Sequence, residues 1–169
     1  CDSLAYNSQT GFIEEALRFF SKNKNLELEI RTKSSYVKPL LKGSLDNIIV
    51  AYSFTPSKFS KIYEKGVPSV EKRMRCVKKL IDLDWKIGLR FDPIIIYKGW
   101  EEDYIYLFKT LFELIPNKLI HSVTYGNIRY PKAQFNKIQK YNAEEKLFFN
   151  LKKNKLLYED YRKEKISSF

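Results

Sequence analysis

Apolar residues recur along this chain in two alternating patterns, one typical of helices and one typical of strands. Residues 11–22 place apolar side chains at the spacing of one helix face, and residues 26–32 alternate apolar and charged side chains as a half-buried strand does. Residues 47–54 form a continuous apolar run of strand length, which favours a parallel sheet that is buried on both faces.

The same patterns predict the remaining elements. We expect further helices over residues 70–83, 101–115 and 132–141, and further strands over residues 86–96 and 121–129. The strand over 86–96 should bend or end at Pro93, because proline cannot donate to a strand ladder. A short loop with a helical turn is expected over residues 34–41. Between the second strand and the next helix, Pro56, Gly66 and Pro68 predict a loop, and Ser69 is a suitable N-cap.

The predicted order is one helix followed by four strand–helix pairs. Such alternation indicates an α/β fold, with a parallel sheet, helices outside it and right-handed crossovers. Periodicity leaves two architectures open, an open doubly wound sheet and part of a larger barrel. We predict one domain over residues 1–143 and a charged C-terminal extension over residues 144–169.

Composition describes a globular chain with a basic surplus. The chain carries 31 basic and 20 acidic residues, a net charge of +11, which favours an anionic partner such as nucleic acid but also simply aids solubility. No stretch approaches the ~18 apolar residues that span a membrane, and no signal peptide is recognised. We therefore expect a cytoplasmic protein without membrane contact. The two cysteines are too few for a disulfide framework, and Cys76 should be a small buried hydrophobe on a helix.

Ligands of parallel α/β sheets bind at the carboxyl ends of the strands. The polar residues expected there are Arg31, Thr32, Lys33, Tyr52, Ser53, Arg90, Asp92, Asn127 and Arg129. This set suits an anionic small molecule, although strand ends are also polar because loops face water. CxxC, HExxH, GxGxxG and P-loop motifs do not occur, so no metal site is predicted within the chain. His121, the single histidine, is interpreted as structural or superficial.

Six segments in order resemble the radical S-adenosylmethionine proteins related to spore photoproduct lyase. They are CDSLAYNSQTGFIEEALRFF, LEIRTKS, NIIVAYS, KGVPSVEKRMRCVKKLID, WKIGLRFDPIIIYKGWEEDY and SVTYGNIRYPK, within residues 1–135. The resemblance implies a partial parallel (β/α)6 barrel, of which this chain would supply about four strands, each followed by a helix, with the first strands missing. In this family a CxxxCxxC motif holds a [4Fe–4S] cluster, which binds S-adenosylmethionine and cleaves it to a 5′-deoxyadenosyl radical.

The resemblance also implies roles for five residues. Cys1 matches a cysteine, in a C-x-S context, that returns a hydrogen atom to the substrate radical. Ser3, Lys33 and Ser53 match residues that contact the cofactor, and Lys33 would reach its carboxylate. Asp92 lies near the strand backbone that flanks the adenine. The substrate in spore photoproduct lyases is a thymine dimer in DNA, so DNA is the expected partner.

The cluster motif of the family is absent from this sequence. We therefore expect the chain to be part of a longer enzyme, inactive alone, in which S-adenosylmethionine and the [4Fe–4S] cluster bind only to the whole protein. Missing strands would leave one sheet edge unpaired, which favours association through that edge.

Three alternatives remain open. Cys1 as a lipidated N-terminus would make the protein a membrane-anchored binding module. Cys1 activated by its own amine would make it an N-terminal nucleophile hydrolase, although those enzymes use antiparallel sheets. The third alternative is a basic nucleic-acid-binding domain without catalysis. The logarithm of its affinity for nucleic acid would fall linearly with the logarithm of the salt concentration.

Overall fold

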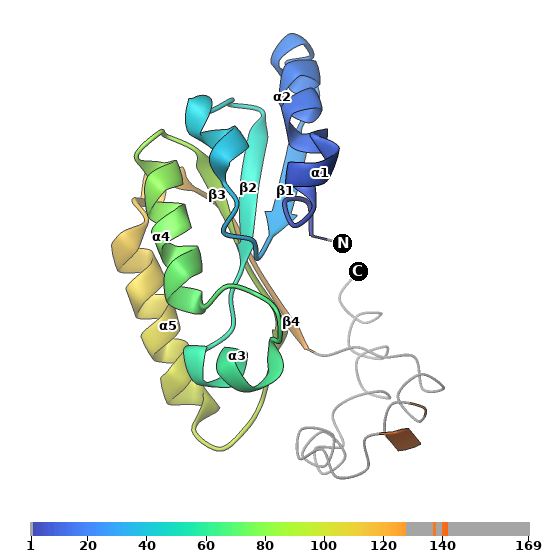
Figure 1. Cartoon of the computed structure of the whole chain (residues 1–169). Coiled ribbons are helices and arrows are strands. Elements are labelled where there is room, and N and C mark those ends of the chain that lie inside the picture. The colour runs from blue at the N-terminus through green and yellow to red at the C-terminus, as the bar shows by residue number, and fades with distance from the viewer. Residues whose placement is uncertain (1, 128–136, 138–139, 142–169) are drawn as a thin grey trace, which may run out of the picture. The chain divides into compact units, whose positions relative to one another are not determined.

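A computed structural model of the chain describes residues 2–127, 137 and 140–141 (Figure 1). The chain divides into two compact units, residues 1–92 with 101–125, and residues 93–100 with 126–169. The first unit contains most of the sheet and all the contacts of the candidate site. In the second unit the Trp100 amide donates to the Tyr97 carbonyl oxygen at 3.1 Å.

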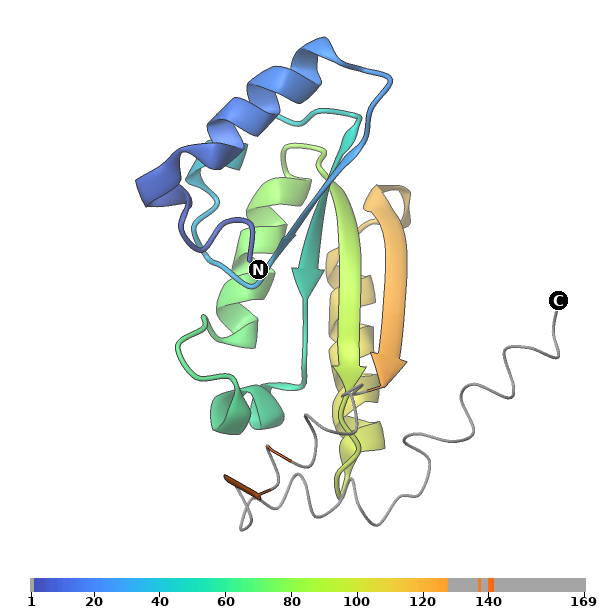
Figure 2. The same ribbon diagram turned by 90° about the vertical axis from the view of Figure 1, so that its right-hand side faces the viewer.

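Within the described residues, one sheet contains four strands in the order β1-β2-β3-β4. They are β1 (Leu28–Thr32), β2 (Ile48–Ser53), β3 (Lys86–Ile94) and β4 (Ile120–Asn127). β1 pairs with β2 and β2 with β3 in parallel, so that Ile30 lies opposite Val50 and Val50 opposite Ile87. β4 runs beside β3 in the same direction (Figure 2). The predicted parallel α/β sheet is thereby confirmed.

The helices lie before, between and after these strands. They are α1 (Asn7–Thr10), α2 (Phe12–Lys22), the 3-10 turn η1 (Lys38–Lys42), α3 (Ser57–Tyr63), α4 (Val70–Ile81), α5 (Trp100–Leu114) and the 3-10 turn η2 (Asn117–Leu119). α4 and α5 cover one face of the sheet (Figures 1 and 2). The predicted N-cap of α4 is confirmed, because the Ser69 hydroxyl accepts from the Lys72 amide at 3.2 Å.

Aromatic side chains join the sheet to its covering helices. The ring of Phe91 on β3 packs edge-on against Phe108 on α5, with centroids 4.7 Å apart. Trp85, fully buried before β3, donates from its indole nitrogen to the Leu40 carbonyl oxygen of η1 at 2.9 Å. Because side chains alternate along a strand, Arg90 and Asp92 point to the face opposite Phe91 and the helices.

Three local features differ from the sequence-based expectations. β3 continues through Pro93 to Ile94, because its registered pairing with β2 ends at Arg90 and the proline removes no donor from that ladder. The expected loop after β2 contains α3, and α1 precedes the first predicted helix. The helix predicted over 132–141 lies mostly outside the described residues, and the boundary at residues 143–144 lies wholly outside them and stays a prediction.

Candidate functional site

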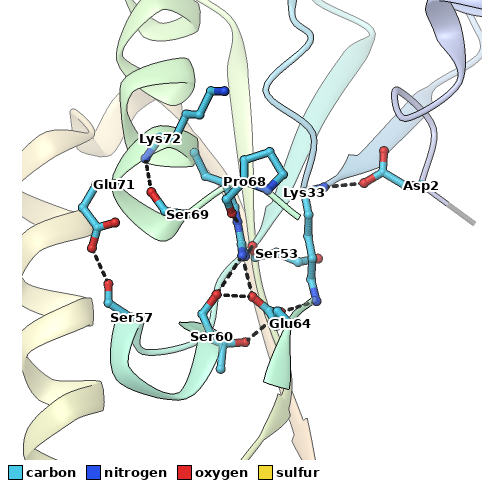
Figure 3. A network of polar contacts seen from close by, with 12 residues as sticks. Asp2, Lys33, Ser53, Ser57, Ser60, Glu64, Pro68, Ser69, Glu71 and Lys72 are labelled. Atoms are coloured by element: carbon cyan, nitrogen blue, oxygen red, sulfur yellow. Dashed lines mark hydrogen bonds and ion pairs between the residues drawn. The ribbon is translucent and has the colours of Figure 1, made fainter. Parts of the chain in front are cut away.

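Asp2 fixes the N-terminal segment to the carboxyl end of β1. Its Oδ1 accepts hydrogen bonds from the Thr32 hydroxyl at 2.7 Å and from the Leu4 amide at 3.0 Å. Its Oδ2 accepts from the Lys33 amide at 2.6 Å (Figure 3). The Ser3 amide donates to the Arg31 carbonyl oxygen at 3.0 Å. Asp2 and Ser3 are therefore held at the end of β1, beside Lys33.

Lys33 lies directly after β1, and its ammonium group donates to Glu64 Oε1. Glu64 follows α3, and its amide donates to the Ser60 carbonyl oxygen at 2.9 Å. The Glu64 side chain is 11% exposed and that of Lys33 is 33% exposed. The lysine therefore retains access to solvent, whereas the carboxylate is almost enclosed.

Arg73 on α4 holds the other oxygen of this carboxylate. Its Nη2 lies 2.5 Å from Glu64 Oε2, and the arginine side chain is fully buried. Its Nη1 donates to the Ser53 carbonyl oxygen at 3.0 Å, and its Nε donates to the Pro68 carbonyl oxygen at 2.9 Å. Arg73 thus ties α4 to the end of β2 and to Glu64.

The surroundings of Glu64 keep it ionised. Burial on its own would raise its pKa, but hydrogen bonds from Lys33, Ser60 and Arg73 outweigh burial and lower the pKa to about 2. Lys33 and Arg73 both contact this one carboxylate, and of the two only the Lys33 ammonium group retains access to solvent. Such a positive charge at the carboxyl ends of strands can bind the carboxylate of a small molecule.

Asp92 belongs to a different cluster, on the sheet face opposite the helices. Its Oδ2 lies 3.3 Å from Arg31 Nη2 and accepts from the Thr124 hydroxyl at 3.2 Å. The structure therefore brings Lys33 and the Ser53 backbone together through Glu64 and Arg73, and it shows no contact that joins Asp92 to them.

Two further residues of the predicted rim, Arg90 and Tyr52, make internal contacts. Arg90 is 4% exposed and forms a two-point contact with Glu29, with Nε 3.0 Å from Oε1 and Nη2 2.5 Å from Oε2. Burial raises the pKa of Tyr52, whose hydroxyl donates to the Ser34 carbonyl oxygen at 2.9 Å. His121 is exposed, as expected of a superficial residue.

Cys1 lies outside the described residues, as does Arg129, and the role of Cys1 stays a prediction. Cys76 is buried as predicted, and its thiol donates to the Ser35 carbonyl oxygen at 3.6 Å. Among the described residues, no group of three or more His, Cys, Asp or Glu side chains is placed to hold a metal ion. These residues therefore do not fit an iron–sulfur cluster, whereas Lys33 fits a cofactor carboxylate.

Sequence reasoning missed Glu64, Ser60 and Arg73. Glu64 and Ser60 fall in the segment predicted as a loop. Arg73 had a detectable signal, because it lies three residues after Val70 and four before Val77 on the apolar face of a predicted helix. A charged residue on such a face requires a buried partner.

The fold and this site define an α/β protein with a parallel sheet and a basic site at the carboxyl ends of β1 and β2. A family model described as spore photoproduct lyase matches residues 1–167, and the chain belongs to this family. This confirms the family that the ordered sequence segments indicated.

Curated relatives and solved structures agree with the family. The chain is 25% identical to the spore photoproduct lyase of Bacillus subtilis (strain 168) over 130 residues, which cover 76% of this chain and 38% of that protein. It is 23% identical to the Clostridium acetobutylicum enzyme over 147 residues, 86% of this chain and 44% of that protein. The chain thus spans about two fifths of the length of these relatives.

A solved mutant of spore photoproduct lyase with bound AdoMet and dinucleoside spore photoproduct matches with a TM-score of 0.70 at 21% identity. The match covers 85% of this chain and 43% of that one, and it confirms the α/β fold class. Across the described residues, no helix has the length and apolar character needed to cross a bilayer.

Proposed function

We propose that this chain supplies the cofactor-carboxylate site and the hydrogen-donor cysteine of a radical S-adenosylmethionine lyase that repairs a thymine photoproduct in DNA. The observation that carries this proposal is the set of Asp2 contacts, which holds the neighbours of Cys1 beside Lys33 at the end of β1. The family match supports the reaction class, and it gives no support to a lipoprotein or to a non-catalytic nucleic-acid-binding domain.

When bound, S-adenosylmethionine supplies the 5′-deoxyadenosyl radical that begins the chemistry of the family. In this chain, the Lys33 ammonium would bind the cofactor carboxylate. Ser3 and Ser53 would complete the contacts at that end of the cofactor. Asp92, in its separate cluster with Arg31, would lie towards the adenine. The [4Fe–4S] cluster would be held by cysteines outside this chain.

Cys1 would act after hydrogen abstraction from the photoproduct. Its S–H bond would break homolytically, the hydrogen atom would pass to the carbon-centred substrate radical, and a thiyl radical would remain on the sulfur. Asp2 serves this role indirectly, because its four accepted hydrogen bonds fix the backbone that follows Cys1. A displaced thiol would let other hydrogen donors reach the radical.

DNA is the proposed macromolecular partner, and the net charge of +11 supports an anionic partner of this kind. The edge of the sheet at β1 is the proposed surface for association with another strand. β1 pairs with β2 on one side only, and on its other side the Ser3 amide binds the Arg31 carbonyl oxygen.

The test is repair of a dinucleoside spore photoproduct by the reduced protein, as its gene encodes it, in the presence of S-adenosylmethionine. We expect the Lys33→Ala variant to lose at least about tenfold in cofactor affinity, because it loses a charge-assisted contact. The exposed Lys38 provides a matched control, and Lys38→Ala should act as the wild type. Cofactor affinity unchanged by Lys33→Ala, or no photoproduct consumed by the wild type, would refute the proposal.

A further inference from the structure

Glu64 is a buried carboxylate that the proposed reaction does not use directly. It lies at the centre of contacts from β1, α3 and α4, and it touches Lys33, the residue proposed to bind the cofactor carboxylate (Figure 3). These contacts allow Glu64 to influence the position of the Lys33 ammonium group.

The orientation of the Glu64 carboxylate is fixed from the side away from Lys33. Its Oε2 accepts from the Ser60 hydroxyl at 2.6 Å and from Arg73 Nη2 at 2.5 Å. Ser60 is 5% exposed, and Arg73 is fully buried. Arg73 Nη2 also donates to the Ser60 hydroxyl at 3.0 Å, so the three side chains hold one another. Oε1 is left to face Lys33, with a long contact of 3.5 Å from the Thr55 hydroxyl.

Arg73 cannot move without breaking contacts elsewhere. Its guanidinium group also donates to the backbone carbonyls of Pro68 and Ser53. An unpaired charge at a fully buried position is strongly unfavourable, so these contacts persist together. The same arginine therefore fixes both Glu64 and the carbonyl group of Ser53, a second residue of the proposed cofactor site.

We infer that Glu64 is a positioning residue, which holds the Lys33 ammonium at the carboxyl end of β1 so that it can receive the carboxylate of the cofactor. The cofactor part of this inference rests on the proposed function. An ammonium group has three N–H donors, and the one bond to Glu64 leaves others for a ligand.

The Glu64→Gln substitution tests whether residue 64 positions the Lys33 ammonium, because it changes the hydrogen bonding of residue 64 but not its size. Arg73 and Lys33 contact different oxygens of the Glu64 carboxylate, and a glutamine has an oxygen at only one of these two places, so it cannot preserve both contacts in this geometry. Because Arg73 is buried, it should keep the oxygen, and the glutamine NH2 group would then face the Lys33 ammonium. The lysine would lose its fixed position while the size of residue 64 stays the same.

The first measurement needs no cofactor. In the protein as its gene encodes it, labelled with ¹⁵N on lysine, an ordered lysine ammonium gives a detectable Nζ signal because its protons exchange slowly. We expect a signal in the wild type that disappears in Lys33→Ala, which assigns it, and that is also lost in Glu64→Gln. Glu71→Gln is the matched control, since Glu71 is another ionised glutamate beside α3 that binds Ser57 and not Lys33. The Lys33 signal should persist in the Glu71→Gln variant.

The second measurement is a double-mutant cycle on S-adenosylmethionine binding by the protein as its gene encodes it. Glu64→Gln should weaken binding by about three- to tenfold, the cost of ordering one long side chain on binding. In the Lys33→Ala background the same substitution should have no effect, because Glu64 acts only through Lys33.

Three results would overturn the inference. They are a Lys33 signal that survives Glu64→Gln, unchanged binding in Glu64→Gln, and an equal loss in both backgrounds, which would mark Glu64 as merely structural. If Lys33→Ala itself left binding unchanged, the proposed function would fail instead, while the ammonium signal would still decide whether Glu64 holds the lysine. Should Glu64→Gln not fold, Ser60→Ala removes one anchor of the carboxylate and keeps its charge. That variant should broaden the Lys33 signal, and an unaltered signal there would also refute the inference.

Discussion

Gly88→Ala tests the packing on the open face of the sheet. A Cβ atom at position 88 would lie 2.8 Å from Arg90 Nη2 and 3.0 Å from the Cβ atom of Ala51. The Arg90 side chain therefore lies flat over Gly88, from where it reaches Glu29 on one side and, at 2.9 Å, the Ser122 hydroxyl on the other. An added methyl group would lift the guanidinium away from both partners.

Effects of opposite sign set the change in the free energy of unfolding that Gly88→Ala causes. Replacing glycine by alanine in extended backbone stabilises by about 0.4–1 kcal/mol through the unfolded state. Overpacking a close contact costs about 1–3 kcal/mol, and displacing a buried arginine from its carboxylate adds to that cost. We therefore expect the free energy of unfolding to fall by about 1–2 kcal/mol, since the steric and electrostatic losses exceed the entropic gain.

Urea denaturation of a double-mutant cycle checks this reasoning. In an Arg90→Ala background the guanidinium is gone, and of the three nearest contacts the one with the Cβ atom of Ala51 remains. Gly88→Ala should then cost much less than in the wild type, or even stabilise. An equal loss in both backgrounds would refute the role given to Arg90 and would place the strain in the sheet backbone.

Three further predictions concern single side chains and pH. Asn47→Ala should lower the free energy of unfolding by about 1–3 kcal/mol, because its side-chain amide donates to the carbonyls of Phe20 in α2 and of Asn23 and Leu26 after it. A loss below about 0.5 kcal/mol in urea denaturation would contradict this. Ser69→Ala should cost about 1 kcal/mol through the N-cap of α4, whereas Ser69→Asp should retain most of the stability. The pKa of Glu64, about 2 in place of its ordinary 4.5, makes its contribution to stability complete above pH 4.5 and lost as the pH falls towards 2. Thermal melts at a series of pH values should show this loss of stability in the wild type and not in Glu64→Gln. An equal pH dependence of stability in the two proteins would contradict this role of Glu64.

The pattern of apolar residues was sufficient to predict the four strands and the longer helices. Continuous apolar runs such as residues 47–54 have few alternatives to a buried parallel strand, and the structure gives that strand as Ile48–Ser53. α3 was missed because it has seven residues and lies between prolines, where local signals favour a loop. Its stability comes from contacts with α4, such as the 2.6 Å hydrogen bond from Ser57 to Glu71.

The candidate site was only partly predictable for the same reason. Strand ends could be located from the sequence, so Lys33 and Ser53 were placed at the correct edge of the sheet. Their connection runs through Glu64, which follows α3, and Arg73 on α4, and both residues lie far from Lys33 in the sequence. Arg90 was expected at the site but pairs with Glu29 on β1, because a buried guanidinium requires a carboxylate partner within its reach.

The two cysteines provide the most direct test of the proposed reaction. The measurement is product analysis after repair of a dinucleoside spore photoproduct by the protein as its gene encodes it, with Cys1→Ala compared with Cys76→Ala. We predict that Cys1→Ala still cleaves S-adenosylmethionine but yields mostly by-products in place of repaired thymine. Cys76→Ala, which removes a buried thiol bound to the Ser35 carbonyl, should give the wild-type product. Normal repair by Cys1→Ala would contradict the role proposed for Cys1.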